Sequence, residues 1–338
     1  MAETSAPLVQ SKPGGESSAC APPKRFWASN SVALRHSLSQ AIDISEVKVL
    51  HRLNPLRHFV FFALLLLEAA LLCLALLPGR NPLTWIPLSL LLGLVFFDFT
   101  VLLHEVVHRI VFIGRHEGLY FLFGWIYAIP SGLSRSQFIR WHLDHHAGLG
   151  SVEEDPKRHW LSPKRNARWF KLLYFTPALI PIYFRAAAKE SARYEKKLRL
   201  RIRLERLIVI GLHAAAVAAI FVWLGAGALL RLYLVPYFFG FPLAFALNRL
   251  GQHYDVDPED PARWGTRMKR SILWDWLFLF SSYHLEHHYF PGVPFYNLRK
   301  LNRSLEPFFK ERGIRARSYS WLLWQWLGRN QKPHAKWE

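Results

Sequence analysis

The sequence of residues 281–291 is Ser281-Ser282-Tyr283-His284-Leu285-Glu286-His287-His288-Tyr289-Phe290-Pro291, and it decides how the rest of the chain is interpreted. Residues three and four apart share one face of a helix, so His284, His287 and His288 are expected to project in the same direction. Neutral imidazole is the commonest protein ligand for transition metals. This spacing therefore predicts part of a metal site.

Two more histidine clusters lie earlier in the chain. The first is His104-Glu105-Val106-Val107-His108, in which His104 and His108 share a helix face, and the second is His142-Leu143-Asp144-His145-His146. Eight of the 16 histidines belong to these three clusters. Because one metal ion accepts at most about six ligands, this number of imidazoles predicts two ions.

A ninth ligand is expected from His253, in the sequence Asn248-Arg249-Leu250-Gly251-Gln252-His253-Tyr254. Asn248 is a candidate to support the ligands from outside or to orient a bound water. The only two cysteines, Cys20 and Cys73, are far apart, which excludes cysteine-held iron–sulfur clusters, zinc fingers and a disulfide framework. A histidine-rich site nearly free of carboxylate ligands suits iron and dioxygen better than magnesium or calcium.

Composition points to a membrane. The chain has 338 residues with a formal net charge of +19, which in a soluble protein would suggest nucleic acid. However, 51% of the residues are hydrophobic and they fall into long uninterrupted runs, so we expect no nucleic-acid partner. The basic charge then indicates membrane topology and contact with anionic lipid, or else a docking patch for an acidic partner.

The predicted fold is an all-α integral membrane protein with four transmembrane helices in two hairpins and a cytoplasmic helical cap that holds the histidines. The spans are expected at 59–77, 83–103, 207–224 and 229–247, with turns at 78–82 and 225–228. A disordered or loosely ordered tail is expected over 1–44, the membrane domain over 45–312, and an amphipathic, Trp-rich segment over 313–338. Lys and Arg gather in the long loop and at both ends, so both termini and the histidine clusters are expected in the cytoplasm.

At these residues the chain resembles the membrane fatty acid desaturase and hydroxylase superfamily, whose three histidine boxes are similar to the three clusters. The resemblance extends from about Arg57 to Phe309, and residues 283–294 are especially similar to the third box of the acyl-lipid branch. It implies a non-haem di-iron centre held by about nine histidines, with dioxygen as co-substrate. Asn248 and His253 are five residues apart, where relatives usually have four.

Several reactions of the superfamily use the same di-iron and dioxygen chemistry. The resemblance favours desaturation of a fatty acyl chain in a lipid or acyl substrate, with hydroxylation or ketolation of a carotenoid or sphingolipid as the alternative. Lys12-Pro13-Gly14-Gly15 lacks the histidine of a fused cytochrome domain, and no dinucleotide-binding glycine pattern occurs. A separate electron donor is therefore implied, either a ferredoxin or a b-type cytochrome with its reductase.

One rival comes from another class of enzyme. His104-Glu105-Val106-Val107-His108 also matches HExxH, the signature of zinc proteases, some of which place it in a membrane helix. That interpretation leaves the other six clustered histidines unexplained.

Other residues are candidates to support or line the site. Four acids are expected to hydrogen-bond to ligand imidazoles or to connect to the metals: Asp98, Glu105, Asp144 and Glu286. Asp155 and Asp257 precede prolines, which indicates turns. His213 is either an interior histidine or an extra ligand. Seven phenylalanines on the spans are candidate walls of a substrate channel: Phe96, Phe97, Phe99, Phe238, Phe239, Phe241 and Phe245.

Overall fold

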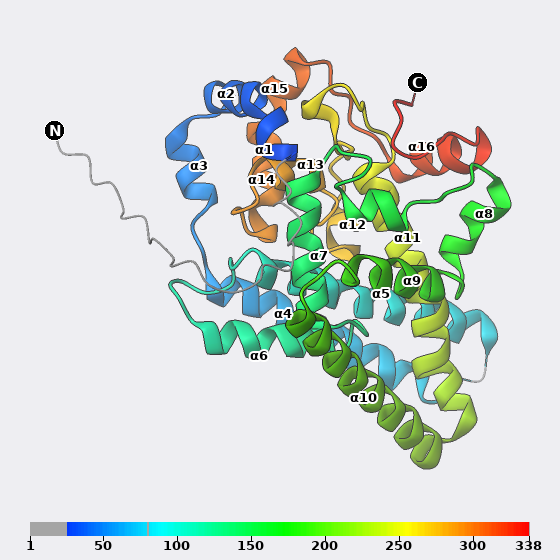
Figure 1. Ribbon diagram of the computed structural model, residues 1–338. Coiled ribbons are helices and arrows are strands. Elements are labelled where there is room, and N and C mark those ends of the chain that lie inside the picture. Colours follow the sequence, from blue (N-terminus) through cyan, green and yellow to red (C-terminus); the bar gives the residue numbers. More distant parts are fainter. Residues whose placement is uncertain (1–25, 80, 338) are drawn as a thin grey trace.

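The structure is a computed structural model that describes residues 26–79 and 81–337. Over these residues the regular elements are helices, and extended backbone pairs only in two isolated bridges, Asp255 with Ala335 and Met268 with Arg317. The prediction of an all-α protein is confirmed. Figure 1 shows the long helices in the lower half of the molecule and most of the short helices above them.

The first two long helices form a hairpin. The chain enters α4 (Pro55–Leu76) and α5 (Pro82–Val107) in the same way, with an asparagine cap followed by proline in the first turn. Both helices are long and apolar enough to cross a membrane. α4 begins four residues and α5 one residue before the predicted spans, and α5 ends at Val107, so it contains His104 and is followed by His108 as its C-cap.

A third apolar helical run extends from Lys196 to His253 and is also long enough to span a membrane. It consists of α10 (Lys196–Leu229), two π-helical turns, η3 (Leu230–Leu234) and η4 (Pro236–Gly240), and α11 (Phe241–His253). Gly225 interrupts α10 with φ 82° and ψ 173°, a conformation that glycine adopts without steric cost. Figure 1 shows the chain reversing direction at the lower end of α10, where the turn at 225–228 was predicted.

The two hairpins touch through their backbones. A Cβ atom on Gly93 of α5 would lie 2.4 Å from the carbonyl oxygen of Pro236 and 2.5 Å from the Cα atom of Gly240 in η4. Small residues at such crossings let helices approach closely in a membrane, where van der Waals packing rather than hydrophobicity drives association. At the far end, the Arg231 guanidinium donates to the carbonyl oxygens of Leu76 (2.8 Å) and Leu77 (2.9 Å).

The N-terminal region corrects one prediction. Helices α1 (Phe26–Asn30), α2 (Val32–Ala41) and α3 (Ile44–Leu50) occupy residues that the sequence placed mostly in a loosely ordered tail. Leu34 and Leu38 of α2 are buried in the main apolar core, so this helix is part of the packed cap. Residues 1–25 of the predicted tail, including Lys12-Pro13-Gly14-Gly15 and Cys20, lie outside the described residues.

The cap covers one end of the hairpins with short helices. These are α6 (Glu117–Ala128), α7 (Arg135–Gly148), η1 (Lys157–Leu161), α8 (Arg168–Leu172), η2 (Leu173–Phe175), α9 (Leu179–Ser191), η5 (Pro261–Arg263), α12 (Ile272–Leu277), α13 (His284–Tyr289), α14 (Phe295–Ser304), α15 (Glu306–Glu311), α16 (Tyr319–Leu323) and η6 (Trp324–Gly328).

The C-terminal segment is fastened to α8. The buried Lys171 ammonium donates to the carbonyl oxygens of Trp326 (2.8 Å) and Gln331 (2.7 Å) and to Asn330 Oδ1 (2.8 Å). Trp326 is itself fully buried, whereas Trp324 next to α16 is exposed. The Trp-rich segment therefore packs partly into the cap instead of presenting all its indoles to a membrane surface.

Candidate metal centre

Four elements carry the clustered histidines to one place. His104 and His108 lie at the C-terminal end of α5, His253 is the last residue of α11, and the other two clusters lie on α7 and α13. The position of α7 is fixed by Glu205 of α10, whose carboxylate accepts hydrogen bonds from Ser134 Oγ (2.7 Å) and from the backbone N–H of Ser136 (2.7 Å). A carboxylate at this end also complements the dipole of α7.

Five histidines form the first histidine group: His104, His108, His142, His146 and His287. Their candidate ligand atoms all lie within 4.8 Å of one another. The Nε2 atoms approach closely in pairs, at 2.9 Å for His108 and His142, 3.0 Å for His104 and His287, and 3.1 Å for His146 and His287. All three clusters contribute to this group, so its nitrogen lone pairs converge from α5, α7 and α13.

Four buried histidines form the second histidine group: His145, His253, His284 and His288. The Nε2 atoms of His145 and His253 are 3.1 Å apart, and those of His284 and His288 are 3.0 Å apart. Neighbouring residues on α7 and α13 thus serve different groups. The structure brings together all nine histidines that the sequence singled out.

Two histidines of the second histidine group have a hydrogen-bond acceptor at the ring nitrogen that points away from the group. His145 Nδ1 lies 2.8 Å from Asp155 Oδ1, and His253 Nδ1 lies 3.2 Å from the carbonyl oxygen of Trp264. An acceptor at Nδ1 fixes the tautomer in which Nε2 keeps its lone pair for a metal. Sequence analysis missed Asp155 and assigned it to a turn, which it also makes by accepting the backbone N–H of Lys157 at 2.9 Å.

Burial keeps the imidazoles in their neutral, ligating form. It lowers the pKa of His108 to about 3, because a charged ring would lose its hydration there and because Lys157 lies nearby. The same cause holds the pKa of other cluster histidines outside the apolar helices well below its usual range: His142, His145, His146, His284, His287 and His288. Burial also lowers the pKa of Lys157, whose Nζ is 3.1 Å from His142 Nδ1, to about 7.

Of the four acids expected near the metals, only Glu105 contacts a clustered histidine. Glu105 Oε1 is 3.5 Å from His104 Nδ1, and its Oε2 accepts the backbone N–H of Phe295 at 3.1 Å. In the structure the Asp144 carboxylate pairs with Arg140 Nε at 3.0 Å. Glu286 accepts from Asn302 Nδ2 at 2.5 Å, and burial raises its pKa to about 7.

Three further predicted residues are not members of the two groups. Asp98 is buried, and its Oδ1 has no hydrogen-bond partner among the described residues. The amide of Asn248 donates to Ser281 Oγ (2.8 Å) and accepts from Gln252 Nε2 (2.6 Å). His213 belongs to neither group, because both of its nitrogens are engaged, with Tyr233 Oη at 2.7 Å and the carbonyl oxygen of Ile129 at 2.8 Å.

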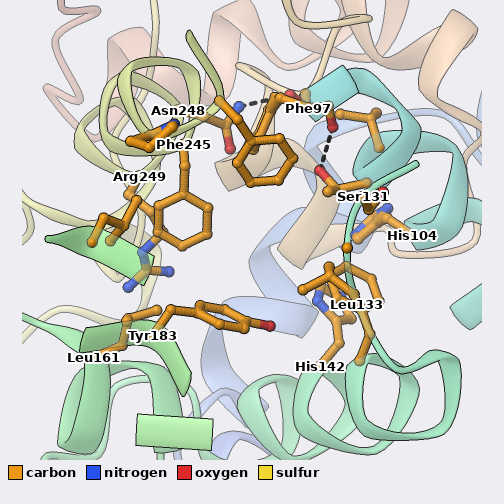
Figure 2. Close-up of a pocket in the computed structure, with 18 of the residues that line it drawn as sticks. Phe97, His104, Ser131, Leu133, His142, Leu161, Tyr183, Phe245, Asn248 and Arg249 are labelled. Carbon is orange, nitrogen blue, oxygen red and sulfur yellow. Dashed lines mark hydrogen bonds between the residues drawn. The ribbon is translucent and has the colours of Figure 1, made fainter. Parts of the chain in front are cut away.

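An apolar cavity of about 280 Å³ lies against both groups, with His104, His142, His284 and His287 in its wall. Figure 2 shows Phe97 and Phe245 on this wall opposite the histidines. Four of the seven predicted phenylalanines line the cavity: Phe97, Phe238, Phe241 and Phe245. Phe96 instead stacks on Tyr237 with ring centroids 4.5 Å apart, and Phe239 is exposed.

The donor set fits transition-metal ions. Both groups offer imidazole nitrogen alone, the ligand type that suits iron, zinc, copper and nickel, and hard oxygen donors for magnesium or calcium are absent from them. The chain matches the family described as fatty acid desaturase over residues 80–320, which includes all nine histidines. No curated protein matches the chain.

Proposed function

The chain belongs to the fatty acid desaturase family, and from this membership we propose that it is a membrane-bound di-iron enzyme that uses dioxygen to introduce a double bond into a fatty acyl chain. One observation carries the proposal: two groups of five and four imidazoles border a single apolar cavity. A cavity of this kind accepts a hydrocarbon chain and presents it to both groups.

Within this proposal the nine histidines hold two iron ions, one in each group. With dioxygen, bound iron supplies the oxidising power to remove two hydrogen atoms from an unactivated chain, which acid–base chemistry cannot do. The protein's own residues orient the ligand imidazoles and exclude water from the cavity. Asp155 and the Trp264 carbonyl orient His145 and His253, and the phenylalanines around the cavity keep water away from the reacting carbons.

The proposed topology places two hairpins in the membrane, with the break at Gly225 separating the third and fourth spans. The abundance of Lys and Arg in the cap and near both ends supports a cytoplasmic centre. Electrons come from a separate ferredoxin or b-type cytochrome with its reductase.

The arrangement of side chains around His104 and His108 argues against a zinc protease. In that class a HExxH pair leaves an open ligand position for water, and its glutamate acts as base. Here His104 and His108 are joined by three further imidazoles, and Glu105 Oε2 is occupied by the Phe295 N–H.

Lipid analysis of a host that expresses the chain tests the proposal. We expect an acyl product that has lost two hydrogen atoms, that requires oxygen and that is absent with His287→Ala. The matched control is His116→Ala, which changes an exposed histidine that belongs to neither histidine group and hydrogen-bonds to the nearby carbonyl of Ile113. A product that gains an oxygen atom would identify a hydroxylase or ketolase, and no oxygen-dependent product would refute the proposal.

A further inference from the structure

Arg249 is a buried cation without a partner. It is 6% exposed, and its Nη1 is enclosed by protein. Among residues 26–79 and 81–337 no hydrogen bond or ion pair reaches this guanidinium. The acid Asp155 and the phenols of Tyr174 and Tyr254 lie near it, as does a second cation, Lys157. Arginine stays charged in proteins, and buried charges are normally paired, so an unpaired guanidinium requires an explanation.

None of these neighbours neutralises the charge at close range. The Asp155 carboxylate is committed to His145 Nδ1 (2.8 Å) and to the backbone N–H of Lys157 (2.9 Å). Phenol groups carry no charge at neutral pH, and the Tyr174 hydroxyl donates to the carbonyl oxygen of Leu161 at 2.9 Å. A buried guanidinium without an anionic partner destabilises the folded protein unless a bound molecule supplies the negative charge.

The position of Arg249 shows where that charge would come from. The side chain lines the apolar cavity, and Figure 2 shows its guanidinium between Phe245, Leu161 and Tyr183 on the cavity wall. Arg249 also precedes His253 of the second histidine group by four residues on α11, so the two lie on one helix face. A molecule in the cavity therefore meets the guanidinium and the histidine groups together.

We propose that Arg249 binds an anionic group of the acyl substrate, a carboxylate or a phosphate, inside the cavity. The guanidinium matches both groups through paired N–H donors, and such charge-assisted bonds are strongest where water is excluded. This inference rests on the proposed function, and it narrows the substrate to acyl chains with a negatively charged end. That end lies on the α11 side of the cavity, near the second histidine group.

Equilibrium binding to the purified protein in neutral detergent tests the assignment. The ligands are palmitate, which carries a carboxylate, dipalmitoyl phosphatidate, which carries a phosphate, and methyl palmitate, which has the same chain without charge. We expect at least one anion to bind about tenfold or more tightly than the ester, the range of a charged hydrogen bond. This preference should disappear in Arg249→Met and persist in Arg203→Met, which removes an exposed arginine of α10.

The outcomes are distinct. An Arg249-dependent preference for palmitate identifies a free acid, and one for phosphatidate identifies a lipid headgroup; both support the proposal. Equal binding of ester and anions by the unaltered protein overturns it, as does a preference that survives Arg249→Met. If Arg249→Met does not fold, Arg249→Lys, which keeps the charge but loses the paired donors, should retain only part of the preference, and full retention would overturn the proposal. Binding needs no turnover, so anion binding without an unsaturated product would refute the desaturase reaction alone.

Discussion

His145 Nδ1 lies 2.8 Å from Asp155 Oδ1, ten residues further along the chain. A carboxylate in this position raises the basicity of the imidazole and fixes its orientation. Asp155→Asn keeps the size of the side chain and an acceptor oxygen but removes the charge. We expect metal affinity at the second histidine group to fall about tenfold, measured by iron retention against a chelator. Asp144→Asn is the control, because that carboxylate pairs with Arg140; an equal loss there would show that Asp155 has no special role.

Iron content should follow the two histidine groups. The purified protein should contain about two iron ions per chain, and His108→Ala and His284→Ala should each lose about one, because each removes a ligand from a different group. Elemental analysis measures both values, with His116→Ala as a control that retains full content. A single zinc ion without iron would contradict the di-iron assignment.

Glu105→Gln distinguishes the desaturase from the protease. In the unaltered protein the Phe295 N–H donates to Glu105 Oε2 at 3.1 Å, and the neutral amide of the variant can still accept this hydrogen bond. We therefore expect the variant to keep both irons and part of its activity. A zinc protease would lose all activity with its general base. If Glu105→Gln is as inactive as His104→Ala while it retains iron, the carboxylate has a direct role in the reaction.

Gly93→Ala should destabilise the packing of the two hairpins. The added methyl group would lie 2.5 Å from Gly240 Cα, so one helix must shift, at a cost of about 1–3 kcal/mol. Thermal unfolding in detergent would show a lower midpoint. Gly211→Ala, on α10 with no atom within 4 Å of the new Cβ, should not lower it. Equal behaviour of the two variants would mean that the crossing is not tightly packed in the membrane.

The topology predicts which segments a modifying enzyme can reach. Tags at either end of the chain and beside Lys164 should report the cytoplasm, whereas tags in the 78–82 turn and after Gly225 should report the opposite side. The reason is the concentration of Lys and Arg in the first set of segments. Glycosylation or protease protection provides the measurement. A tag after Gly225 on the cytoplasmic side would mean that α10 and α11 do not form a membrane hairpin.

The histidines could be found from sequence because their spacing is local. Helix geometry alone places His284 and His288 on one face, and apolar length alone locates the long helices. Helix geometry does not decide the roles of the acids between the histidines. Asp144 pairs with Arg140, and Glu286 accepts from Asn302, a residue of another helix.

Other features depend on contacts between distant segments. No sequence spacing indicates that Asp155 reaches His145 across a loop or that the Trp264 carbonyl reaches His253. The unpaired state of Arg249 likewise emerges only when the cavity is formed. No helix was expected over residues 26–41, where two buried leucines, Leu34 and Leu38, supply the packing. Packing against the rest of the fold thus stabilises helices that local composition does not predict.

The break at Gly225 leaves α10 and the return segment projecting away from the cap, with many apolar side chains facing outward, such as Phe221, Val222 and Trp223. The same hairpin supplies His213, Tyr233 and Phe238 to the wall of the cavity. In the proposed topology, lipid tails form the outer packing layer of the proposed substrate channel. A bilayer whose thickness mismatches the hairpin would tilt it and reshape that wall, so the thickness of the surrounding membrane becomes a determinant of which chain lengths the channel accommodates.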